Sequence, residues 1–163
     1  MSIRSTKPFL AEHAALRDQV EHLPVIAREF PRMDANERVE TVEVIVGFLA
    51  DMLLPHCAAE QRVLYPEAAR LLGEADGSDA VESDRLQVRE LLGRLADIGA
   101  DDVGELQEVV FALYALLSAH MWREEEVYVK LVGVRDEAGA NAIFKRVAEA
   151  ERPVASVRVV AAE

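Results

Sequence analysis

Two segments of this chain place the same polar pair inside an apolar pattern of helical period. In LLPHCAAEQRVLYPE, His56 is followed four residues later by Glu60. In SAHMWREEEVYVKLV, His120 is followed by Glu124 at the same spacing. Residues four apart in an α-helix differ by about 40° around its axis, so each pair occupies one helix face. The two pairs therefore predict two helices with the same polar feature.

The apolar neighbours of these pairs predict that both face a core. On a helical wheel, the apolar residues within about 40° of His56 are Ile45, Leu49, Met52 and Val63. Those within about 40° of His120 are Leu113, Leu116, Val127 and Leu131. A third histidine, His13, lies on the apolar face of an N-terminal helical pattern, whereas His22 lies about 180° away from it. We therefore expect three His and two Glu to point inward.

The helix-start signals and the lengths of the periodic segments predict an all-α fold. Three Asp-x-x-Glu pairs are typical of helix starts: Asp34–Glu37, Asp79–Glu82 and Asp102–Glu105. The expected helices span about 8–30, 35–73, 79–98, 102–132 and 135–150, followed by the tail RPVASVRVVAAE. Long helices with short connections favour an antiparallel up-down-up-down four-helix bundle. We expect a single domain over 1–163, with the bundle at about 8–132 and a short fifth helix and tail at about 133–163.

Composition narrows the classes of partner and compartment. The 30 acidic and 18 basic residues give a formal net charge of −12, which disfavours nucleic acid and anionic membranes and favours a cation. No apolar run approaches the roughly 20 residues of a membrane span, and the N-terminus shows no secretion signal. A single cysteine, Cys57, excludes an intramolecular disulfide and fits a reducing cytoplasm.

The inward His and Glu residues predict a metal site. A polar group in a core costs a few kcal/mol unless it is satisfied, and a bare carboxylate costs more. A metal ion can satisfy all five, because imidazole suits iron, zinc, copper or nickel and a carboxylate can bridge two ions. Helical bundles hold such sites between facing helices.

Three segments carry a resemblance to a known family. LAEHAALRDQV, LLPHCAAEQRVLYPE and LSAHMWREEEVYV resemble the His-His-Glu cation-binding domains of the hemerythrin-like family. The resemblance covers roughly residues 8–132 and implies a bundle around a non-haem, usually di-iron, centre. It implies the metal ligands His13, His56, Glu60, His120 and Glu124. Glu125 is a fallback for Glu124, because some members use a spacing one residue longer.

The third helix departs from the family pattern. The family places a His there within His-x-x-Val-Arg, but this chain has RLQVR, with Arg85 at the position of the His. Asp84 or Glu82 can substitute as a ligand, which favours an oxygen-rich site that tolerates manganese as well as iron. Alternatively, a single ion binds, or Arg85 pairs with the core carboxylates in place of a cation.

Other residues receive simpler interpretations. We expect Cys57 to be a small buried apolar side chain. Tyr65 and Tyr128 can line an oxygen pocket, but packing is the commoner role for such residues. Trp122 points away from His120 and covers another surface or the fifth helix. Pro55 leaves the carbonyl of Asp51 without its usual donor, which predicts a bend just before His56.

Two functional hypotheses follow. The first is a metal-binding protein, with one or two iron ions or else manganese or zinc, that handles or senses oxygen, peroxide, nitric oxide or iron. The second is a metal-free regulatory or interaction module in which Arg85 replaces the cation. For Phe144, Val147 and the VRVV segment of the tail, two arrangements are open: they pack across chains in a homodimer, or they fold back on the bundle.

Overall fold

The computed structural model describes residues 7–73, 78–134 and 137–151, and these are helical apart from short turns. The elements are α1 (Lys7–Glu29), the 3-10 turn η1 (Phe30–Arg32), α2 (Ala35–Phe48), the π-helical η2 (Leu49–Leu53), α3 (Leu54–Leu72), α4 (Ser78–Asp97), α5 (Val103–Val134) and α6 (Glu137–Glu151). No strand occurs within this part of the chain, so the predicted all-α class is confirmed.

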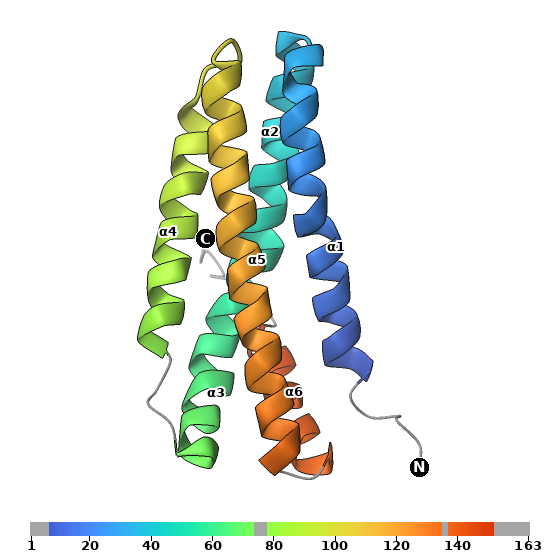
Figure 1. The fold of residues 1–163 in the computed structure, drawn as a ribbon, viewed down its shortest axis with the longest axis vertical. Coiled ribbons are helices and arrows are strands. Elements are labelled where there is room, and N and C mark those ends of the chain that lie inside the picture. The colour runs from blue at the N-terminus through green and yellow to red at the C-terminus, as the bar shows by residue number, and fades with distance from the viewer. Residues whose placement is uncertain (1–6, 74–77, 135–136, 152–163) are drawn as a thin grey trace, which may run out of the picture.

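The long helices form the predicted bundle (Figure 1). In Figure 1, α1 runs upward, α2, η2 and α3 run downward as one stretch, α4 runs upward and α5 downward. Helix α5 packs against α1 and α4, and α6 turns back to pack against α3. The predicted tail lies outside the described residues. The His–Glu pairs of α3 and α5 thus come from neighbouring elements of one bundle.

Helix boundaries agree with the capping pattern at two of three places. At the start of α2, Asp34 accepts a hydrogen bond from the Glu37 amide at 2.9 Å, and Glu37 accepts one from the Asp34 amide at 2.8 Å. Helix α5 begins directly after Asp102. The third pair is displaced, because α4 already includes Asp79 in its first turn.

The apolar core has two parts. The larger part joins α1, α2, η2, α4 and α5 through residues that include Val20, Ile45, Leu49, Leu95 and Leu113. The smaller part joins α3 to α6 and contains Ala59, Leu64, Tyr65, Ala68, Ile143, Phe144 and Val147. Phe144 and Val147 are only 5% and 1% exposed, so they pack within the chain. Their burial agrees with the alternative that these residues fold back on the bundle, and the homodimer stays a prediction.

The stretch before His56 departs from α-helical geometry. Leu49–Leu53 forms a π-helical turn, and the amide of Leu54 donates to the carbonyl of Leu49, five residues earlier. Pro55 follows with no amide hydrogen to donate. The sequence predicted a disturbance at Pro55, and the structure places it in the preceding turn. Such π-helical turns often occur at functional sites, and this one sets the rotation with which His56 enters the core.

One helical stretch is more apolar than expected. Ala35–Leu71 is long and apolar enough to cross a membrane by length and composition, with a mean hydropathy of 1.6 in its most apolar window. In the bundle, 33% of that window is buried. The expectation that no run approaches the length of a span is thus not met. Core helices of bundles pass the same test, and this stretch carries the buried His56 and Glu60.

Candidate metal centre

The five predicted ligands are buried together in the bundle. His13, His56, Glu60, His120 and Glu124 are between 0% and 4% exposed. They are the buried polar or charged residues in the part of the chain whose side chains the structure describes. His22, by contrast, is exposed, as predicted. Helical period alone thus separated the inward histidines from the outward one.

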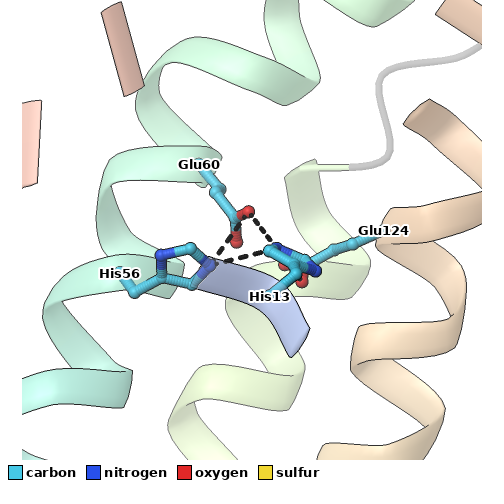
Figure 2. A group of neighbouring side chains, drawn as sticks. All are labelled: His13, His56, Glu60 and Glu124. Carbon is cyan, nitrogen blue, oxygen red and sulfur yellow. Dashed lines mark hydrogen bonds and ion pairs between the residues drawn. The ribbon is translucent and has the colours of Figure 1, made fainter. Parts of the chain in front are cut away.

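Four of these side chains converge on one point (Figure 2). The Nε2 atom of His13 lies 3.0 Å from Oε1 of Glu60 and 3.6 Å from Oε2 of Glu124. The Nε2 atom of His56 lies 3.2 Å from both Glu60 Oε1 and His13 Nε2. Figure 2 shows α1 contributing His13, α3 contributing His56 and Glu60, and α5 contributing Glu124. Ligand atoms of all four residues lie within 4.8 Å of one another.

His120 occupies the other side of the same carboxylates. Its Nε2 atom lies 2.8 Å from Oε1 of Glu124, but the contact lacks hydrogen-bond geometry. Both atoms are buried without a hydrogen-bond partner in the described part of the chain, as is Oε2 of Glu60. Buried polar atoms in folded proteins nearly always have a partner. Atoms without one that converge in a core indicate a site built for an ion.

Carboxylates also hold the outer nitrogens of two histidines. Nδ1 of His56 donates to Oε1 of Glu151 at 2.7 Å, and Nδ1 of His120 lies 3.4 Å from Oδ2 of Asp84. Asp84 also pairs with Arg123. Metal-binding histidines typically donate their second N–H to a carboxylate, which directs the other nitrogen to the metal. The sequence interpretation considered Asp84 as a ligand and missed Glu151 entirely.

Loss of the Glu151 carboxylate is expected to weaken metal binding about 10- to 100-fold, because His56 loses its orienting partner. Glu151→Gln retains the shape and removes the charge. Glu149→Gln is the matched control, since Glu149 is exposed on the same helix. Competition with a chelator measures both affinities. Equal affinities for the two variants would show that Glu151 has no role in the centre.

Arg85 does not reach the core carboxylates. Its guanidinium donates to both carboxylate oxygens of Glu82, with distances from 2.6 to 3.1 Å. Both partners are on α4 and partly exposed, so in this structure Glu82 lies outside the buried cluster and Arg85 pairs with it instead of with the core carboxylates. A contact three residues away on the same helix satisfies the guanidinium without burying its charge.

Arg85→Ala is consequently expected to change the free energy of unfolding by less than about 1 kcal/mol, as for other exposed ion pairs. Leu95→Ala, a fully buried position on the same helix, is expected to cost about 2–5 kcal/mol. Urea denaturation measures both. A cost of several kcal/mol for Arg85→Ala would instead indicate that this side chain balances the buried carboxylates.

Opposing electrostatic effects act on the buried groups. Burial alone lowers the pKa of His56, but its bonds to Glu151 and Glu60 raise it to about 11. Burial also lowers the pKa of His120, but the charge of Glu124 together with its side-chain contacts to Asp84 and Glu124 raises it overall. Burial and the charge of Glu60 raise the pKa of Glu124 to about 7. The two carboxylates thus draw positive charge into the core, which protons on the imidazoles or a metal cation can supply.

Several neighbouring residues lie outside the cluster. Glu125 pairs with Arg17, so it does not replace Glu124 at the centre. Trp122 is 67% exposed, in agreement with the prediction that it points away. Tyr65 is buried in the smaller part of the core, and its hydroxyl has no partner among the described residues. The side chain of Tyr128 lies outside the described residues.

The residues present fit a metal ion. The cluster offers three imidazoles and two carboxylates, a donor set that suits iron, manganese or zinc. Several of its buried polar atoms lack a hydrogen-bond partner in the described part of the chain, which a bound cation would provide. A cation would be held by His13, His56, Glu60 and Glu124 on one side and by His120 with the same carboxylates on the other.

Fold and site together define a helical bundle with a buried His–Glu cation centre. The family model of the hemerythrin HHE cation-binding domain matches residues 5–132. The chain therefore belongs to the hemerythrin HHE cation-binding family. No curated protein and no solved structure matches the chain significantly.

Proposed function

We propose that this protein binds one or two non-haem iron ions through His13, His56, Glu60, His120 and Glu124. The observation that carries the proposal is the burial of these five groups with ligand atoms directed at each other and partly unsatisfied. Two carboxylates shared between His-bearing helices are typical of dinuclear sites in bundles. Family membership supports the cation, and the nitrogen-rich donor set supports iron over magnesium or calcium.

The proposed ligand of the iron is a small molecule such as dioxygen, peroxide or nitric oxide. A cavity of about 570 Å³ borders His56 and Glu151, and its wall includes Leu16, Phe48 and Met52. Apolar lining beside a charged centre admits small uncharged molecules and disfavours anions. Bound iron would supply redox chemistry and an open coordination position, and the cavity would give a small molecule access to the His56 side of the centre.

With this chemistry, the protein would either handle or sense dioxygen, peroxide or nitric oxide in the cell. The single cysteine and the absence of disulfide pairing favour a reducing, cytoplasmic setting. The metal-free alternative depended on Arg85 pairing with the core carboxylates, and Arg85 pairs with Glu82 instead. We therefore favour the metal-dependent role.

The experiment is anaerobic loading with ferrous iron, followed by separate exposure to dioxygen, peroxide and nitric oxide. Visible and near-ultraviolet absorption should change with at least one of them, in proportion to bound iron. Glu60→Gln serves as the control that lacks the shared carboxylate. Iron-loaded protein whose spectrum responds to none of the three would contradict the proposed ligand class.

A further inference from the structure

Cys57 faces a different part of the centre from its neighbour His56. The two residues are adjacent on α3, and both are buried. Ligand atoms of Cys57, Glu60 and His120 lie within 4.8 Å of one another. The thiol is thus on the His120 side of the carboxylates, whereas His56 is on the His13 side.

The spacing of this second group suits a single ion. Metal–ligand bonds of about 2.0 Å to nitrogen or oxygen and 2.3 Å to sulfur allow two ligands of one ion to lie up to roughly 4.4 Å apart. The three ligand atoms need little contraction to reach that limit. No backbone rearrangement is required, since the side chains already share one space.

Two of the three residues carry buried atoms without partners. Nε2 of His120 and Oε2 of Glu60 have no hydrogen-bond partner in the described part of the chain. Their side chains are only 3% and 0% exposed. Buried polar atoms without a partner indicate that a ligand belongs beside them.

A small void of about 10 Å³ adjoins the same group on the side of α4. Cys57, His120 and Arg85 are among the residues that line it. Arg85 directs its guanidinium to Glu82, so α4 supplies no imidazole there. Among the α3 residues that line this void, Cys57 has a side chain that can bind a metal. It can provide a soft donor, whereas α4 brings only the carboxylate of Asp84, which contacts Nδ1 of His120.

We propose that Cys57 is a metal ligand, and that with His120 and Glu60 it forms a second cation position distinct from that of His13 and His56. The inference rests on the proposed function, because it describes the other half of the same centre. A thiolate favours a borderline-soft divalent cation, such as zinc or ferrous iron, over manganese or magnesium. The two positions are therefore chemically unequal.

Binding requires deprotonation of the thiol. A divalent ion forms a bond to sulfur and releases the thiol proton to solvent, and no oxidant or reductant takes part. The sulfur is uncharged as the free thiol and carries one negative charge as the metal-bound thiolate.

Titration of the metal-free full-length protein with Co²⁺ tests the proposal. Cobalt at nitrogen and oxygen ligands gives weak visible bands, whereas a thiolate adds an intense charge-transfer band in the near ultraviolet. The chain has a single cysteine, so such a band can arise only from Cys57. We expect the band to develop with the second equivalent of cobalt. Zinc, but not manganese, should remove it.

Cys57→Ser is expected to abolish the band, retain the visible bands of the first position and weaken the second equivalent at least about tenfold. Circular dichroism establishes that the variant is folded. Visible cobalt bands without charge transfer in the unmodified protein would overturn the role of Cys57 and leave the centre intact. Failure to bind any cobalt would overturn the proposed function itself.

Discussion

Glu60→Gln is expected to lower metal binding by at least about 100-fold, more than the loss of an outer carboxylate. Glu60 accepts from His13, contacts His56 and belongs to both groups of candidate ligands. The change preserves volume but replaces an anionic oxygen with an amide that cannot neutralise a cation. Both positions of the centre should therefore lose affinity. Isothermal titration with ferrous iron under anaerobic conditions measures the effect.

The control for this change is Glu126→Gln. Glu126 is exposed on α5, two residues after Glu124, so its charge contributes nothing to the buried cluster. The affinity of the Glu126→Gln variant for ferrous iron should equal that of the unmodified protein. If Glu60→Gln binds iron as tightly as Glu126→Gln, the buried carboxylate is not a ligand.

Removal of the metal is expected to lower the thermal unfolding midpoint by about 5–10 °C. A ligand present at 100 times its dissociation constant stabilises the native state by about 2.7 kcal/mol, and each kcal/mol shifts the midpoint of a chain of this size by about 2–4 °C. The loss arises because Glu60 and Glu124 return to mutual repulsion in a core where both are fully buried. Thermal unfolding with and without a chelator measures it.

The Glu60→Gln variant provides the internal reference for that comparison. It holds no metal in this account, so a chelator should leave its midpoint unchanged. If a chelator also leaves the midpoint of the unmodified, metal-loaded protein unchanged, protonated histidines and ion pairs are sufficient to stabilise the cluster. The cation would then not be part of the folded core.

Local patterns were sufficient to predict the helices and the inward ligands. Helical period placed His13, His56 and His120 on core faces and His22 on the outside, and the structure agrees. This worked because a bundle buries one stripe of each helix, and the stripe is visible in a single segment. The capping pair Asp34–Glu37 fixed a helix start for the same local reason.

Contacts between distant segments were not predictable in this way. Glu151 reaches His56 from 95 residues away because α6 folds back along α3, and no local signal specifies that return. Arg85 had two partners compatible with its helix position, and the nearby Glu82 prevailed over the buried carboxylates because it avoids desolvation. The sequence alone predicted Cys57 to be a small buried apolar residue, because its proximity to His120 depends on how α3 and α5 pack together.

Elemental analysis of protein purified without added metal tests the central claim most directly. We predict about one or two ions per chain, mainly iron, as in other His–Glu bundle sites. Glu60→Gln purified in parallel should contain almost none. A folded, unmodified protein with no more metal than this variant would contradict the account.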